Sequence, residues 1–166
     1  LTVRQKRNAP FFDDKTQTDL NAYWLSTLNF VAEIFDKEDW KKITENNFKL
    51  IQNQTNEEIF HCYKDKEGVK VFLEDYVYLS QLMINLYETT GKNNYLNDAK
   101  ETMEKTWNIF YDKKNKILQK NPVNENDLFV PPSDINDHNI PNGNSVFLIN
   151  CKKLEAITNE NKWKNI

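Results

Sequence analysis

The sequence has 166 residues, of which 39% are hydrophobic, 13% aromatic and 28% charged. This composition excludes an intrinsically disordered chain, and the length gives no reason to expect more than one domain. The net charge of −3 comes from interspersed side chains of both signs without a basic stripe, so we expect no nucleic-acid partner. No apolar run approaches the ~20 residues that a bilayer-spanning helix needs, so we expect no membrane partner.

The chain contains two cysteines, Cys62 and Cys151, which are far apart and form no CxxC motif. This pattern is typical of a reduced intracellular protein with small buried thiols, and we expect a cytoplasmic location. The sequence begins without a methionine or a secretory signal pattern, and its end predicts the start of a further helix near Trp163. We therefore expect the chain to be a segment of a longer polypeptide.

Five segments have the apolar spacing of helices, which predicts an all-α fold. The first, second and fourth segments are apolar on one side. The third is apolar at nearly every position, as is the first half of the fifth, which indicates burial nearly all round. The predicted helices extend over about residues 18–35, 37–52, 72–90 and 94–110, and the fifth begins near residue 144.

The first two helices each carry a row of apolar residues spaced by threes and fours, which predicts one apolar face per helix. The rows are Leu20, Trp24, Leu28, Val31 and Phe35 in the first helix, and Trp40, Ile43, Leu50 and Ile51 in the second.

From the second segment onward, helices that are apolar on one side alternate with helices that are apolar nearly all round. The third and fifth segments are then inner helices and the second and fourth are outer ones, and the place of the first in this order makes it inner. This alternation favours two concentric layers, with inner helices covered on both sides and outer helices covered on one. The turns from inner to outer helices are tight, whereas the returns, at about residues 54–71 and 111–142, are long. We expect the long loops and the N-terminal ends of the inner helices to share one rim.

A polar cluster marks the start of each inner helix. The clusters are Asp13-Asp14-Lys15, Glu74-Asp75-Tyr76 and Asn142-Gly143-Asn144-Ser145. The interval from Asp14 to Asp75 is similar to that from Asp75 to Asn144, which indicates a recurring helical hairpin.

These motifs resemble those of the YyaL/spermatogenesis-associated protein 20 family, whose members are described as thioredoxin domain-containing proteins. The resemblance covers most of the chain, with the motifs in the family's order. It rests on Arg7-x-x-Pro10-x-x-Asp13-Asp14-Lys15-x-x-Thr18-x-x-Asn21, on Phe72-Leu73-Glu74-Asp75-Tyr76 followed by Leu86-Tyr87-Glu88-x-Thr90-Gly91, and on Pro141-Asn142-Gly143-Asn144-Ser145. Leu20-Asn21-Ala22 departs from the family's Trp-Asn-Gly, and Asn142 replaces a serine.

The resemblance implies a thioredoxin-like domain followed by an (α/α)6-type toroid, similar to six-hairpin glycosidases and sugar epimerases. Residues 1–166 would then form a single helical domain within the toroid, with hairpins at about residues 18–52, 72–110 and 144–166. The implied partners are a sugar-like ligand in the central cavity and the thioredoxin-like domain of the same chain. We expect no cofactor and no metal. Because an incomplete toroid exposes apolar inner-helix surface, we also expect self-association.

Carboxylates are the main candidates for chemistry at the rim. Asp13 and Asp14 precede a helix, where they either cap free N–H groups or face the central cavity. Glu74 and Asp75 lie in an apolar segment, where a carboxylate is costly unless it is paired or faces a cavity. Two carboxylates that face one cavity suit glycoside hydrolysis, so the catalytic candidates are Asp14 and Asp75. The candidates for ligand binding are Asp13, Lys15, Glu74, Tyr76, Asn142, Asn144 and Ser145.

Each ligand candidate also has a structural interpretation. Tyr76 suits a packed aromatic, Lys15 suits an ion pair with a neighbouring aspartate, and Asn142 to Ser145 form a helix-start signal. His61 and His138 could act as bases, but they lie on loops without metal-ligand spacing. Three hypotheses remain open: a carbohydrate-active hydrolase or epimerase domain, a non-catalytic helical scaffold, and a piece without independent function.

Overall fold

The computed structural model describes residues 7–8, 12, 14–55, 58–62, 71–124, 135–137 and 139–165. Within these ranges the chain is mostly helical, which confirms the predicted all-α class. None of the described helices combines the length and apolar character needed to cross a bilayer. The elements are α1 (Thr18–Ile34), α2 (Glu38–Thr55), α3 (Leu73–Thr90), α4 (Asn93–Phe110), the antiparallel pair β1 (Tyr111–Asp112) and β2 (Ile117–Leu118), α5 (Gly143–Thr158) and a 3-10 helix (Asn161–Trp163).

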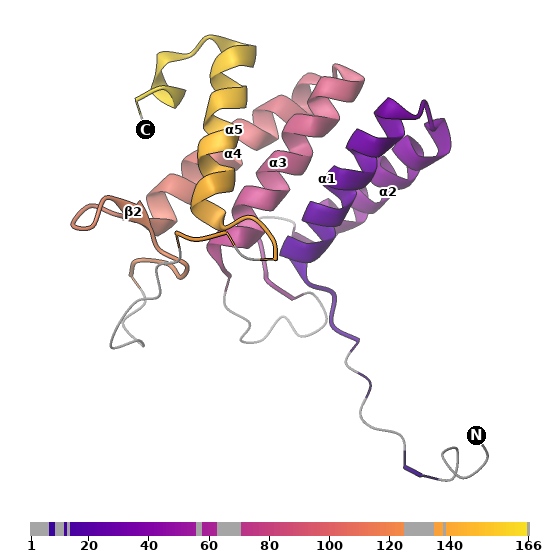
Figure 1. Cartoon of the computed structure of the whole chain (residues 1–166), viewed down its shortest axis with the longest axis horizontal. Helices are drawn as coiled ribbons and strands as arrows, with labels where there is room; N and C mark the ends of the chain where they lie inside the picture. Colours follow the sequence, from indigo (N-terminus) through magenta and orange to yellow (C-terminus); the bar gives the residue numbers. More distant parts are fainter. Residues whose placement is uncertain are drawn as a thin grey trace.

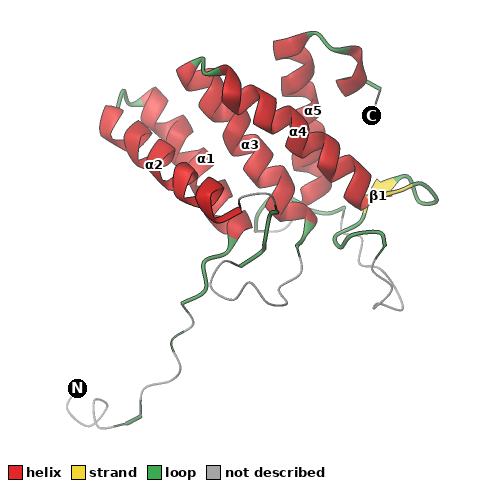
Figure 2. Cartoon of the chain, turned by 180° about the vertical axis from the view of Figure 1, so that it is seen from behind, coloured by secondary structure: helices red, strands yellow, loops and turns green. Residues whose placement is uncertain are grey.

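The helices form two layers. α1, α3 and α5 lie side by side in one layer, with α2 and α4 behind them (Figure 1). From the opposite side, α2 and α4 lie in front (Figure 2). α3 is central, because it contacts α1, α4 and α5. The predicted alternation of inner and outer helices is therefore confirmed.

Tight turns join α1 to α2 and α3 to α4. Gly91 ends α3 with a φ of 67°, a left-handed conformation that carries no Cβ penalty in glycine. Its N–H donates to the Tyr87 carbonyl at 2.8 Å, which closes the last turn of the helix. Both tight turns lie at the end of the molecule opposite the long loops (Figure 1).

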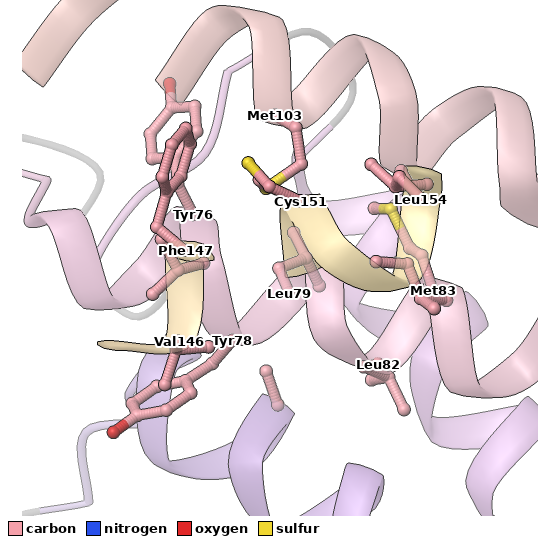
Figure 3. Packing of buried hydrophobic residues seen from close by; sticks show 14 of the residues in the cluster. Tyr76, Tyr78, Leu79, Leu82, Met83, Met103, Val146, Phe147, Cys151 and Leu154 are labelled. Carbon is pink, nitrogen blue, oxygen red and sulfur yellow. The ribbon is translucent and has the colours of Figure 1, made fainter. Parts of the chain in front are cut away.

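The core centres on α3, which is buried on nearly all sides, as its sequence predicts. Leu79 and Met83 of α3 lie close to Met103 of α4 and to Cys151 and Leu154 of α5 (Figure 3). Both cysteines of the chain are buried free thiols, in agreement with the sequence.

The apolar faces predicted for α1 and α2 are only partly buried. Leu20 and Trp24 of α1 are 46% and 56% exposed, Phe35 just after α1 is 64% exposed, and Leu50 of α2 is 59% exposed. The reason lies in the position of α1, which forms the edge of the inner layer; in the part of the chain that the structure describes, its lateral neighbour is α3 alone (Figure 1). The buried residues of α1 are mostly small or polar: Thr18, Ala22, Leu25, Ser26, Asn29 and Ala32.

Amide side chains join the three inner helices. Asn29 of α1 donates to the Asn85 carbonyl of α3 at 3.2 Å, and the Asn85 amide donates to the Ser26 hydroxyl at 2.6 Å. Across the other interface, Asn150 of α5 donates to the Val77 carbonyl of α3 at 2.9 Å. Because a buried amide is costly without its partner, these bonds favour one register between neighbouring helices.

Candidate functional site

The N-terminal ends of α1, α3 and α5 lie at the same end of the molecule as the long loops (Figure 1). The segment before α1 joins the loop at residues 58–62 through a bridge between Gln17 and Cys62. The Tyr78 hydroxyl of α3 donates to the carbonyl of Pro141, just before α5. The chain therefore builds one rim from these helix starts and loops, as the sequence predicts.

A pocket with a volume of about 360 Å³ lies at this rim. This volume falls within the range of roughly 300 to 1,000 Å³ that is common for small-molecule sites. Phe72 and Pro141 contribute apolar surface. The polar wall includes the side chains of Gln17, Asp19, His61, Glu74, Lys120 and Asn142.

Asp19 and Glu74 hold equivalent positions, because each is the second residue of its inner helix. Both carboxylates line the pocket. The helix N-termini of α1 and α3 favour negative charge at these positions. The Oε2 atom of Glu74 is buried and has no hydrogen-bond partner among the described residues. A buried oxygen without a partner is costly, so a donor that reached this atom would stabilise it.

Asp75 lies behind the pocket and is fully buried. Its Oδ2 accepts a hydrogen bond from the Phe72 N–H at 2.8 Å, and its Oδ1 accepts one from the Asp19 N–H at 3.2 Å. One carboxylate thus caps the first turns of both α3 and α1. Burial raises the pKa of Asp75 to about 6, although the hydrogen bonds from Phe72 and His61 oppose the shift.

His61 contacts Asp75 and Gln17 through its ring and Thr18 through its backbone carbonyl. Its Nδ1 lies 3.0 Å from Oδ1 of Asp75, and its Nε2 lies 3.2 Å from the amide nitrogen of Gln17. The ring packs edge-to-face on Phe72 with 4.8 Å between centroids. The Thr18 N–H donates to the His61 carbonyl at 3.0 Å, which holds the loop against the start of α1.

Asp19, His61 and Asp75 bring ligand-type atoms within 4.8 Å of one another. Hydrogen bonds already account for this approach, because Nδ1 of His61 faces both oxygens of Asp75 at 3.0 and 3.2 Å. The arrangement in the structure is that of a hydrogen-bonded pair.

Asn142, Asn144 and Ser145, at the start of α5, form hydrogen bonds mainly with backbone groups. Asn142 caps the helix by accepting from the Ser145 N–H at 3.0 Å, and it also lines the pocket. Its amide donates to the Ser145 hydroxyl at 3.2 Å. Asn144 turns toward β2, where it accepts from the Leu118 N–H at 3.1 Å and donates to the Leu118 carbonyl at 3.0 Å.

Other predicted site residues lie away from the rim pocket. Tyr76 is buried, packs edge-to-face on Phe110, and lines a separate hollow of about 230 Å³ between α2, α3 and α4. Its burial raises its pKa. Asp14 and Lys15 are exposed and precede α1. Asp13 and His138 lie outside the described residues.

The predicted register placed Asp14, Asp75 and Asn144 at equivalent points, but the structure places them differently. Asp14 precedes α1, whereas Asp75 and Asn144 lie inside α3 and α5. The residues that face the pocket are Asp19, Glu74 and Asn142. Asp19 lies one residue after the predicted start of the first helix, so its place at the rim could have been found from the sequence. Gln17 and Lys120 carry no comparable signal in the sequence.

No family model and no curated protein matches the sequence. Solved structures do match. A GH76 alpha-mannanase of Bacteroides thetaiotaomicron has a TM-score of 0.72 at 15% identity, over 96% of this chain and 43% of that chain. A glycoside hydrolase family 76 mannosidase of the same organism has a TM-score of 0.70 at 14% identity, over 91% of this chain and 42% of its own. The GH76A alpha-1,6-mannanase from Salegentibacter sp. HEL1_6 has a TM-score of 0.68 at 10% identity, over 98% and 47%.

The chain has the fold of part of an α/α toroid. The predicted fold class is thereby confirmed, while the predicted hairpin bounds stay a prediction. The chain spans less than half of the length of each matched structure. At these identities the likeness shows the fold alone. Membership of the YyaL/spermatogenesis-associated protein 20 family finds no support in a family or sequence match, and it stays a prediction.

Proposed function

We propose that this chain is part of a carbohydrate-active α/α toroid that binds a sugar-like ligand in the rim pocket. The proposal rests on one observation: Asp19 and Glu74, two carboxylates at equivalent helix positions, line the same pocket. The matched structures are named as mannanases or a mannosidase. This naming makes an α-mannoside the first ligand to test.

The chemistry of the pocket wall suits a polyhydroxylated ligand. Carboxylates accept hydrogen bonds from sugar hydroxyls, while the Gln17 and Asn142 amides both donate and accept. Glycoside hydrolysis commonly uses two carboxyl groups, one on each side of the scissile bond. In this pocket Asp19 and Glu74 take the place that the sequence assigned to Asp14 and Asp75. Asp75 supports them from behind, because its oxygens are occupied by backbone N–H groups and His61.

The test is a thermal-shift screen with methyl α-mannoside, other mono- and disaccharides, and sugar phosphates. A ligand that binds only the folded state at about 100 times its Kd stabilises it by ~2.7 kcal/mol, which raises the melting temperature by several degrees. We expect Glu74→Gln to remove most of this rise, because the amide replaces one acceptor oxygen with a donor. Glu101→Gln, in an exposed ion pair with Lys105 on α4, is the matched control and should keep it.

A scaffold without catalysis is the second candidate. It is favoured by the structural hydrogen bonds of Asp75 and Asn144, which secure helix starts and β2. If no sugar raises the melting temperature of the unchanged protein, the scaffold function becomes the better one. The predicted docking of a thioredoxin-like domain from the same polypeptide could then be tested by adding that domain as a separate protein.

A further inference from the structure

The partners of both ring nitrogens favour one tautomer of His61. Its Nδ1 faces the Asp75 carboxylate at 3.0 Å, and a carboxylate accepts. Its Nε2 faces the amide nitrogen of Gln17 at 3.2 Å, and an amide NH₂ group only donates. Both contacts are satisfied when the proton is on Nδ1 and Nε2 carries a lone pair.

The ring is held in this orientation from several sides. The His61 side chain is 14% exposed, and the Asp75 side chain is fully buried. Phe72 packs against the ring, while the backbone of Thr18 holds the His61 carbonyl. A ligand that meets Nε2 therefore meets a group whose position is already fixed, so that little conformational entropy is lost on binding.

We propose that His61 is the hydrogen-bond acceptor of the rim pocket for a ligand hydroxyl, and that Asp75 is the positioning residue that keeps Nε2 free of a proton. A ligand hydroxyl that reaches Nε2 must displace the Gln17 amide, which lies 3.2 Å from it. The hydroxyl can then donate to Nε2 while its oxygen accepts from the displaced amide, so that one direct hydrogen bond is replaced by two. The inference rests on the proposed function for the identity of the ligand as a sugar, but the state of the ring can be measured without any ligand.

Two substitutions separate the roles of the two ring nitrogens. In His61→Asn the amide nitrogen takes the place of Nδ1, so the bond to Asp75 is kept while Nε2 is removed. In His61→Gln the amide nitrogen takes the place of Nε2, so the bond to Asp75 is lost and the pocket gains a donor. We expect His61→Asn to retain a melting temperature nearer that of the unchanged protein, and both variants to lose the shift caused by methyl α-mannoside.

Nitrogen NMR of the full chain with ¹⁵N-labelled histidine reads the tautomer directly. The chain has two histidines, so His138→Gln assigns the signals of His61. At about pH 8, above the ordinary histidine pKa of about 6.5, neutral rings dominate in general. We expect a protonated Nδ1 and an unprotonated Nε2 in His61, and a change in the Nε2 shift when methyl α-mannoside is added.

The possible outcomes separate this inference from the proposed function. A proton on Nε2 overturns the inference, whatever the sugar does. A sugar that raises the melting temperature but leaves the Nε2 shift unchanged also overturns it, while the carbohydrate function stands. If no sugar binds, the proposed function fails, and the ligand role of His61 fails with it. A protonated Nδ1 together with a sugar-dependent Nε2 shift supports both.

Discussion

Asp75 receives hydrogen bonds from three separate segments: the N–H of Phe72, the N–H of Asp19 and the ring of His61. At the residue scale this explains why an aspartate occurs in an otherwise apolar helix. The sequence indicated that a carboxylate here must be paired or face a cavity, and the structure shows the paired arrangement. The bond from Phe72 is local, but the sequence could not show that Asp19 and His61 supply the other donors, because these residues lie 56 and 14 positions away along the chain.

The raised pKa of Asp75 predicts a pH dependence of stability. An unfolded aspartate has a pKa of about 3.9, and burial raises that of folded Asp75 to about 6. Between these values the folded state binds more protons, so the contribution of Asp75 to the unfolding free energy falls as pH rises from about 4 to 6. In Asp75→Asn this loss is absent.

We therefore expect Asp75→Asn to gain stability relative to the unchanged protein, by on the order of 2–3 kcal/mol, as pH rises through this window. Urea unfolding of both proteins at several pH values measures it. The difference between the two proteins is the readout, because the other carboxylates are common to both. A difference that does not change with pH would contradict the predicted shift.

At the element scale, helix positions followed closely from the sequence, whereas the packed faces did not. Periodicity and Gly91 were enough to predict α3, since nearly all of its sides are covered. The buried face of α1 is set by its neighbour α3, which meets Ser26 and Asn29 and leaves Trp24 exposed. No pattern within α1 alone contains that information, because both faces carry residues at helical spacing.

Close approach between the starts of α3 and α5 predicts the effect of a small substitution. A Cβ at Gly143 would lie 2.7 Å from both Cγ and Cδ2 of Leu73. We expect Gly143→Ala to lower the unfolding free energy by about 1–3 kcal/mol, as overpacking generally does. Leu73→Ala removes the atoms in question, so the cost of Gly143→Ala should be smaller in that background. Denaturant unfolding of the unchanged protein, the two single variants and the double variant gives the coupling free energy between the two positions. Strictly additive effects would exclude this contact as the cause.

At the scale of the whole molecule, the inner layer ends in apolar surface on both sides. Phe30 and Ile34 of α1 are exposed, as are Leu148 and Ile149 of α5. The two helix layers were predictable because alternating helix types and long loops recur along the chain, whereas the toroid was implied by the family resemblance. The location of the pocket at the rim was predictable. Its lining residues were not, because they depend on loop conformations for which the sequence holds no periodic signal.

Exposed apolar side chains of this kind promote association, so we expect the chain to self-associate in solution. Sedimentation velocity over a range of concentrations should show species larger than a monomer at high concentration. Phe30→Glu should shift the distribution toward monomer, because it places a charge on the exposed side of α1. A monomer at every concentration in the unchanged protein would contradict the prediction.

The rim pocket takes its wall from parts of the chain that are far apart in sequence, among them Gln17, His61, Glu74, Lys120 and Asn142. Local opening of a single hairpin would remove part of this wall. A bound ligand would then oppose the opening of every hairpin at once, and amide hydrogen exchange should slow in helices that never touch it. Ligand binding at the rim would thus make the hairpins more cooperative with one another, at a distance from the site itself.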